Sequence, residues 1–233
     1  MSAEFFRALA RRAAGRYRTD RFARHFAYFK LTGDPAFRHL LESGLLAGRE
    51  RLLDLGCGQG MLEALLAAAG EARERWPQEW APAPAPRAME GIELDRRALE
   101  RARLAAVGHA RFVHGDIRNV AFAEADAIVI LDVLHYMDRP AQEAVLERAR
   151  RSIAPGGVLL VRVADARPGL RFRATLALDR LSLWLRGRRS GAYHCRPLAA
   201  WIARLEALGL AVEARPMSAG TPFANVLLVA RAA

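Results

Sequence analysis

The glycine-rich segment at residues 53–60 constrains most strongly what this chain can fold into. Residues 51–55 form a short apolar run that is typical of a buried strand, and three glycines follow at alternate positions. Glycine adopts left-handed backbone conformations without steric cost, so these residues suit a tight turn. Leucines at helical spacing begin at Leu62, which predicts a helix starting near Met61. The order of strand, glycine turn and helix is typical of nucleotide-binding α/β domains.

Strands and helices continue to alternate along the chain, which predicts a mostly parallel sheet with helices on both faces. The run at 127–131 is apolar at every position, as expected of a strand buried on both faces. A chain of 233 residues is long enough for one such domain with additional helices. Further strands are predicted at 89–95, 111–114, 158–164, 210–215 and 225–230, the last two as an antiparallel hairpin, with helices at 96–106, 138–152 and 198–208 and a turn at 155–157.

Two basic amphipathic segments lie outside this alternation. In residues 1–48, apolar side chains recur at helical spacing among arginines. The last of these helices is expected over 37–46, with its end at Gly44 or Gly48. The segment is predicted either to cover the edge of the main domain or to contact an anionic membrane or an acidic carrier protein. Residues 167–191 mix leucine and arginine and are predicted to form a helical cap insertion over a ligand crevice. The main domain is expected to span 49–233, with a proline-rich surface insertion at 76–86.

The net charge of +11 comes almost entirely from arginine, because Lys30 is the only lysine. This charge points towards acidic partners, with GC-rich coding as the alternative explanation. Cys57 and Cys195 are expected to stay reduced, since Cys57 lies in the glycine turn, where a thiol suits close packing. Charges interrupt the N-terminus too early for a signal peptide, and no uncharged apolar run has membrane-spanning length. A cytoplasmic protein is predicted, with attachment to a membrane surface as an option.

Carboxylates are predicted at the ends of successive strands. Glu93 closes the second strand, Asp116 follows the third and Asp132 follows the fourth. Ligands of open parallel sheets bind beyond the carboxyl ends of the strands, where the free N–H groups of the helix after Gly60 also point. A carboxylate there can accept from both hydroxyls of a ribose, and the next can accept from an adenine amino group. For Asp116 and Asp132, ordinary turn capping is the alternative.

The spacing of the glycines argues against a nicotinamide cofactor. The dinucleotide fingerprint requires glycine at the first, third and sixth positions of the turn, and the sixth position here is Met61. An oxidoreductase of that type is therefore not favoured.

Over about residues 45–165 the chain resembles the class I S-adenosylmethionine-dependent methyltransferases. The resemblance lies in the glycine turn and its strand, in Gly91-Ile92-Glu93-Leu94-Asp95, in Gly115-Asp116-Ile117, and in the segments 127–135 and 153–159. It implies an α/β fold with a Rossmann-like sheet in the order 3-2-1-4-5-7-6, whose last-added strand is antiparallel. It also implies S-adenosylmethionine (S-adenosyl-L-methionine) as the cofactor and S-adenosylhomocysteine (S-adenosyl-L-homocysteine) as the product.

The resemblance further assigns cofactor contacts to single positions in the glycine turn. The methionyl part of the cofactor is expected against Asp54, Gly56 and Gly58. Cys57 and Gly60 are expected to complete the same binding turn.

Contacts with the nucleoside are assigned to the next strands. Glu93 is expected to hold the ribose hydroxyls, and Leu94 to pack on the adenine. Asp116 and Ile117 are expected to bind the amino edge of the adenine. No metal site is predicted.

The segment after the fourth strand is expected beside the reacting methyl group. Leu131 would offer a backbone contact near the sulfonium, with Asp132 in support. His135 is a candidate general base, because histidine titrates near neutral pH, and Tyr136 is its candidate partner. The alternative is that this pair only packs beneath the cap. His194 is a weaker candidate base.

The motifs that are absent restrict the class of methyl acceptor more than the motifs that are present. Enzymes of this fold that methylate exocyclic amines of nucleic-acid bases carry a Pro-Pro motif after the fourth strand, whereas this chain has Asp132-Val133-Leu134-His135. Catalytic lysines of the ribose-methylating type are also absent within the main domain. We predict methyl transfer to oxygen of a small hydrophobic, lipid-like or carrier-bound acceptor in a bacterial biosynthetic pathway. The alternatives are a catalytically silent scaffold protein that binds the cofactor and, less favoured, an RNA methyltransferase.

Overall fold

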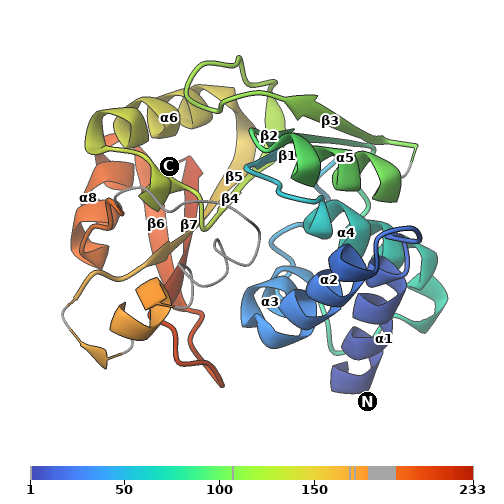
Figure 1. Ribbon diagram of the computed structural model, residues 1–233. Helices are drawn as coiled ribbons and strands as arrows, with labels where there is room; N and C mark the ends of the chain where they lie inside the picture. The colour runs from blue at the N-terminus through green and yellow to red at the C-terminus, as the bar shows by residue number, and fades with distance from the viewer. Residues whose placement is uncertain (1, 107, 168, 171, 178–192, 233) are drawn as a thin grey trace.

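The computed structural model describes residues 2–106, 108–167, 169–170, 172–177 and 193–232. Among these residues the strands form one seven-stranded sheet in the order β3-β2-β1-β4-β5-β7-β6 (Figure 1). Neighbouring strands are parallel, except that β7 runs antiparallel to β5 and β6. The predicted Rossmann-like topology is confirmed. The strands are β1 (Arg51–Leu55), β2 (Ala88–Glu93), β3 (Ala110–His114), β4 (Ala125–Leu131), β5 (Ile153–Ala164), β6 (Leu210–Pro216) and β7 (Asn225–Ala232).

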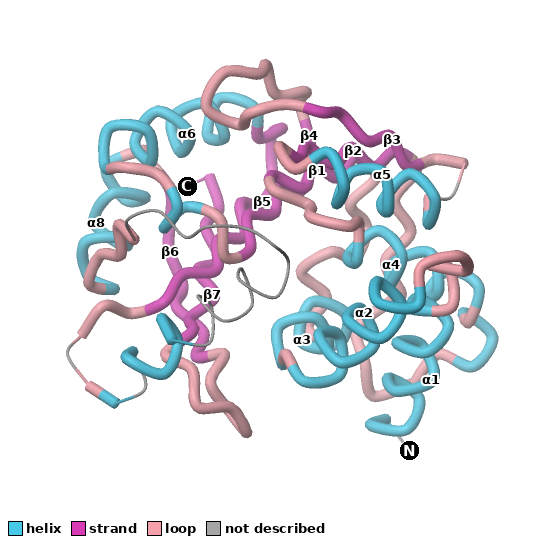
Figure 2. Tube along the Cα trace, viewed as in Figure 1, coloured by secondary structure: helices cyan, strands magenta, loops and turns pink. Residues whose placement is uncertain are grey.

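Both faces of the sheet are covered, because successive side chains of each strand point to opposite faces. Leu52 of β1 belongs to one buried cluster, whereas Leu53 belongs to another. Figure 2 shows the strands between two groups of helices. The first group comprises α1 (Ser2–Ala14), α2 (Arg21–Gly33), α3 (Pro35–Glu42), α4 (Met61–Glu71) and α5 (Arg96–Ala105), and the second comprises α6 (Arg139–Ser152) and α8 (Leu198–Ala207); short 3-10 turns are η1 (Arg73–Arg75) and η2 (Leu134–Tyr136).

Aspartate side chains begin four of these helices. Asp20, Asp34, Asp95 and Asp138 each accept a hydrogen bond from a backbone N–H of the first turn of α2, α3, α5 and α6, respectively. Such caps satisfy donors that have no partner within the helix. Asp34 is therefore held in a fixed position between α2 and α3.

The N-terminal helices share the core of the sheet. Phe6 and Leu9 of α1 are buried in the same cluster as Leu52 of β1 and Leu65 of α4. Their arginines, such as Arg7, lie on the exposed side. The N-terminal segment therefore covers part of the main domain, which is the first of the two roles expected from the sequence. The boundary at residue 48 and the contact with membranes or acidic carriers stay predictions. Within the described part of the chain, no helix combines the length and apolarity needed to cross a bilayer.

Two local predictions were wrong. Residues 155–157, predicted as a turn, lie within β5, which begins at Ile153 and pairs with β4 across a shift in register. Of the two expected ends of the third helix, Gly44 is confirmed: α3 ends at Glu42 and the chain turns at Gly44, whose φ of +73° is left-handed. The insertion at 76–86 is not merely a surface loop, since Trp80 is buried edge-on against Phe5 of α1 at 5.7 Å between ring centroids.

Candidate functional site

A cavity of about 690 Å³ lies at the carboxyl ends of the central strands. It extends from the glycine turn to the N-terminal helices on one side and to the loops before α8 and β7 on the other. The size is within the usual range of small-molecule sites. All residues of the predicted site except Gly60 line it, namely Asp54, Gly56, Cys57, Gly58, Glu93, Leu94, Asp116, Ile117, Leu131, Asp132, His135 and Tyr136.

The glycine turn is fastened to β2 and bends towards the cavity. The backbone N–H groups of Gly56 and Cys57 both donate to the Ile92 carbonyl, at 2.8 and 3.2 Å. A Cβ atom at Gly58 would meet no atom within 4 Å, so this backbone is open to a ligand. A Cβ atom at Gly60 would lie 2.9 Å from the Phe112 ring. Gly60 is therefore needed for close packing against β3. It does not line the cavity, although the sequence resemblance predicts that it belongs to the cofactor-binding turn.

Glu93 is a fixed acceptor in the wall of the cavity. One carboxylate oxygen accepts from the Gly58 N–H at 2.9 Å, and the other accepts from the Asp95 N–H at 2.7 Å. These bonds orient the carboxylate, and each oxygen keeps a lone pair for a ligand hydroxyl. The side chain is almost buried, so a ligand bond to it is formed away from water.

The neighbouring residues of β2 and β3 provide one apolar and one charged surface. Leu94 is half exposed and presents an apolar side chain at the cavity. Asp116 accepts from the Arg118 guanidinium in a two-bond pair, with nitrogen–oxygen distances of 2.9 and 2.6 Å. This hydrogen bonding from Arg118 lowers the pKa of Asp116, which therefore stays ionised as an acceptor.

Two buried carboxylates lie beneath the glycine turn. Asp54 at the end of β1 and Glu63 in the first turn of α4 are both almost fully buried. Neither Glu63 oxygen has a hydrogen-bond partner, and neither residue has an ion pair with the described residues. Burial, reinforced by their mutual repulsion, raises the pKa of Asp54, and burial raises the pKa of Glu63 to about 7. Asp54 lines the cavity and is therefore available to a cationic group of a ligand, whereas Glu63 lies outside the lining.

A first prediction concerns Glu63→Gln. Above about pH 4.3, the ordinary pKa of a glutamate, the unfolded chain has released the Glu63 proton, whereas the folded wild-type protein still holds it. Stability therefore falls as the pH rises from that value towards about 7. Between about pH 5 and about pH 8, the free energy of unfolding should fall by roughly 1–3 kcal/mol more in the wild type than in Glu63→Gln. Urea unfolding at both pH values measures this, and parallel pH profiles would contradict it.

The N-terminal segment closes over the glycine turn from the other side. The Tyr17 hydroxyl donates to the Gln59 carbonyl at 2.8 Å, and the Gln59 side chain donates to the Ala23 carbonyl at 2.9 Å. Asp20 also pairs with Arg101 of α5 at 2.7 Å. These bonds place α2 beside the glycine turn, where Phe26 and Phe29 join the lining of the cavity.

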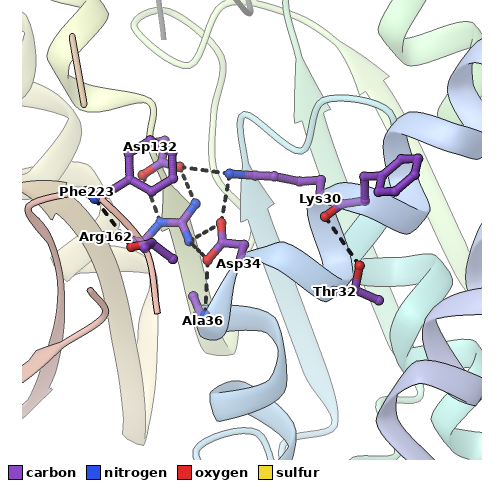
Figure 3. A network of polar contacts seen from close by, with 9 residues as sticks. Lys30, Thr32, Asp34, Ala36, Asp132, Arg162 and Phe223 are labelled. Carbon is purple, nitrogen blue, oxygen red and sulfur yellow. Dashed lines mark hydrogen bonds and ion pairs between the residues drawn. The ribbon is translucent and has the colours of Figure 1, made fainter. Parts of the chain in front are cut away.

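A polar network connects the N-terminal helices with the ends of β4 and β5 (Figure 3). Arg162 of β5 is fully buried and forms ion pairs with Asp34 and with Asp132. Lys30 of α2 lies 2.7 Å from Asp34 and 3.6 Å from Asp132. Burial alone would raise the pKa of Asp34, but the charges of Arg162 and Lys30 lower it below its usual range. Two cations and two carboxylates thus give a network without net charge.

Asp132 owes its position to this network. Its φ of +57° is the single positive value found at a non-glycine residue in the described part of the chain. Aspartate tolerates this conformation better than most residues. The Arg162 guanidinium donates to it through Nε at 2.8 Å and through a second nitrogen. The carboxylate is thereby fixed at the carboxyl end of β4, in the wall of the cavity.

The candidate catalytic residues occupy the 3-10 turn after β4. The rings of His135 and Tyr136 lie 4.1 Å apart, and Tyr193 stacks on His135 at 5.6 Å. His194 lies outside the cavity lining, and its backbone N–H donates to the His135 carbonyl at 2.8 Å. Of the predicted cap at 167–191, residues 168, 171 and 178–191 lie outside the described residues. Thr175 and Leu176, in the helical stretch at 172–177, line the cavity.

Gln142 of α6 supports this turn from below. Its amide nitrogen, which carries two N–H donors, lies within hydrogen-bond distance of the carbonyls of Leu134, Met137 and His194, at 3.0, 3.0 and 2.7 Å. Its oxygen accepts from Arg196 at 2.6 Å. A fully buried glutamine with all of these partners fixes the backbone around the candidate catalytic residues.

We therefore expect Gln142→Leu to lower the free energy of unfolding by about 1–3 kcal/mol, because the variant removes the side-chain donor to three backbone carbonyls and the acceptor of the Arg196 Nε–H group. Urea unfolding measures the change. The matched control is Gln78→Leu, on an exposed loop, where the expected change is below about 0.5 kcal/mol. Equal effects of the two substitutions would contradict this role of Gln142.

Several residues of the site were not singled out from the sequence. Glu63, Gln142 and Asp34 lie in ordinary helical or capping positions, and no sequence signal distinguishes them. Arg162 did carry a signal, since it is a charge inside the otherwise apolar strand β5. Lys30 also carried one, as the only lysine of the chain.

Comparison with known proteins agrees with this geometry. The family described as "Methyltransferase domain" matches residues 9–215. An uncharacterized methyltransferase of Mycobacterium tuberculosis is 31% identical over 135 residues, which are 57% of this chain and 59% of that protein. The match thus covers less than two thirds of the relative's length.

Solved structures show the same fold at low identity. Magnesium protoporphyrin IX methyltransferase from Synechocystis is 18% identical, with a TM-score of 0.60 over 99% of this chain and 94% of the other. An O-methyltransferase family protein from Burkholderia thailandensis is 20% identical, with a TM-score of 0.60 over 96% and 64%. The family match covers most of the sequence, and the chain therefore belongs to the methyltransferase domain family.

Proposed function

We propose that this protein transfers the methyl group of S-adenosylmethionine to an oxygen atom of a small hydrophobic acceptor, either free, lipid-like or attached to a carrier. The observation that carries the proposal is a single cavity that joins the glycine turn and its carboxylates to a largely aromatic second half. The methyltransferase family supports the reaction type. The O-methyltransferase among the neighbours supports oxygen as the acceptor atom by analogy of fold only.

The residues present fit this cofactor. Its sulfonium and ammonium groups are cations, and Asp54 is a buried carboxylate in the cavity lining without a cationic partner among the described residues. The open backbone at Gly58 leaves room for the methionyl part. Glu93 would accept from the ribose hydroxyls, and Leu94 and Ile117 would contact the adenine.

When bound, S-adenosylmethionine supplies a methyl group already activated as a sulfonium. The protein then has to align the acceptor, exclude water and remove the acceptor proton. His135 lies in the cavity wall beside Tyr136 and Tyr193, and we assign it the acceptance of that proton. Tyr136 and Tyr193 would orient the imidazole through their ring contacts.

Calorimetric titration with S-adenosylmethionine, S-adenosylhomocysteine and NAD tests the cofactor assignment. We expect saturable binding of the first two and no binding of NAD. Binding of NAD alone would overturn the proposal. Methyl transfer from labelled cofactor to a panel of aromatic and aliphatic alcohols then tests the reaction, with His135→Ala expected to be slower by about 100-fold or more. Intact cofactor binding with no transfer to any acceptor would instead favour a scaffold protein.

A further inference from the structure

The acceptor half of the cavity differs in character from the cofactor half. Its walls carry aromatic side chains from two directions, with Phe26, Phe29 and Phe37 on α2 and α3, and with Tyr136, Tyr193 and Phe223 on the loops opposite. Aromatic side chains on facing walls favour a flat ring, because they stack on its faces or contact its edge.

A lysine ammonium lies at the side of this aromatic space. Lys30 lines the cavity, its side chain is one-third exposed, and one of its three N–H donors is used by Asp34 at 2.7 Å. Figure 3 shows the side chain reaching from α2 towards Asp132 on the opposite wall. Arg162 already pairs with both carboxylates, so Lys30 can give a donor to a ligand without leaving either carboxylate unpaired.

We infer that the acceptor is a planar phenol and that Lys30 recognises its reacting oxygen. The inference rests on the proposed function, which it makes more specific. An opposite charge nearby lowers the pKa of an acidic group by about 1–3 units. A phenol, which like tyrosine titrates near 10, then approaches the neutral range, whereas an aliphatic alcohol, comparable to water at about 15.7, does not. Among hydroxyl acceptors, a cationic donor at this place favours phenols.

The step needs a proton acceptor and a cation beside the reacting oxygen, and His135 and Lys30 supply them. The phenol O–H bond breaks and its proton passes to His135, while the Lys30 ammonium stabilises the negative oxygen. The oxygen–carbon bond to the methyl group forms as the carbon–sulfur bond of the sulfonium breaks, which leaves a neutral thioether. A lysine suits this role because its ammonium is a compact charge with rotatable donors.

Charged and polar groups surround the Lys30 ammonium. Asp34 and Asp132 contact it, and Arg162 pairs with both of these carboxylates. His135, Tyr136, Tyr193 and Cys195 line the same half of the cavity. Removing the lysine charge leaves the network with one excess negative charge, which should disfavour a bound phenolate.

Binding of 4-nitrophenol tests the inference without methyl transfer, because only its phenolate is coloured. We expect the bound phenol in the wild-type protein to titrate at least about 1 pH unit below the free phenol. In Lys30→Met this shift should disappear, and affinity near neutral pH should fall by about 10-fold or more. Lys30→Arg should keep much of the shift. Arg87→Met, at an exposed position, is the matched control and should behave as the wild type.

Three results would overturn the inference, namely no saturable binding of 4-nitrophenol, the same titration of the bound phenol in the wild type and Lys30→Met, or a preference for 4-nitrobenzoate. The last would identify an aromatic carboxylate as the ligand. Calorimetry with S-adenosylhomocysteine on the same samples keeps the two proposals separate. Its binding should be unchanged in Lys30→Met, and its failure in the wild type would count against the proposed function alone. Thermal unfolding of each variant confirms that it is folded.

Discussion

Arg162→Met is expected to lower the free energy of unfolding by about 3–5 kcal/mol, the range found when one partner of a buried ion pair is removed. Arg162 is fully buried between Asp34 and Asp132. Without it, two carboxylates share Lys30 as their only nearby cation in the network. Urea unfolding followed by circular dichroism measures the loss.

The matched control is Arg51→Met on the surface. Arg51 also pairs with two carboxylates, Glu124 and Asp126, at 2.7 and 2.9 Å, but its side chain is nearly half exposed. The expected loss there is much smaller than for Arg162→Met, because water and salt screen exposed pairs. Adding Asp34→Asn to Arg162→Met should recover part of the stability, since it removes one of the two buried charges. Similar losses for Arg162→Met and Arg51→Met would contradict the importance of the buried network.

The same network predicts a dependence on acid. The pKa of Asp34 is lowered in the folded protein, so its contribution is present above the unfolded value of about 3.9 and is lost as the pH falls. Below about pH 5, stability should therefore decrease more steeply in the wild type than in Asp34→Asn. Unfolding curves at several acidic pH values measure the difference, which should vanish if Asp34 titrates alike in both states.

Glu93→Ala is expected to weaken binding of S-adenosylhomocysteine by about 100-fold or more. Two hydrogen bonds from ribose hydroxyls to a charged acceptor are each worth about 1.5–3 kcal/mol. The carboxylate also holds the N–H groups of Gly58 and Asp95, so its removal additionally loosens the glycine turn. Calorimetry measures the affinity, and undiminished binding would sink the assignment of Glu93.

A modified ligand separates direct contact from loosening of the turn. The 2′-deoxy form of S-adenosylhomocysteine lacks one of the two hydroxyls, so the wild type should bind it about 10-fold or more less tightly. Glu93→Ala should bind both forms with similar affinity if the carboxylate contacts the ribose. Glu90→Ala on the same strand, whose side chain lies outside the cavity lining, is the control and should discriminate as the wild type does.

The local pattern of the sequence was sufficient for the sheet and for the cofactor half of the cavity. Apolar runs such as 127–131 mark buried strands, and the positions directly after such strands meet at one edge of a parallel sheet. The sequence alone therefore predicted that Glu93 and Asp116 lie at the same edge of the sheet. The error at 155–157 is local, because a glycine permits an irregularity within a strand as readily as a turn.

The acceptor half could not be predicted in the same way. Lys30, Asp34, Asp132 and Arg162 are distant in sequence, and only the packing of the N-terminal helices against the sheet brings them into contact. Gln142 likewise has no distinguishing feature in the sequence, and its role follows only from the packing of α6 beside Leu134 and His194. Contacts of this kind depend on how two elements sit against each other, which no short sequence window contains.

The sequence by itself thus determined the order of strands and helices, the glycine turn and the carboxylates that follow the strands, since these features depend on neighbouring residues and on a regular sheet. Only the tertiary structure decided that the N-terminal helices form a wall of the cavity, that the single lysine faces the acceptor space, and that a buried arginine holds Asp132 in place. The physical reason is that buried charges require partners, and those partners come from whichever segments the folded core brings together.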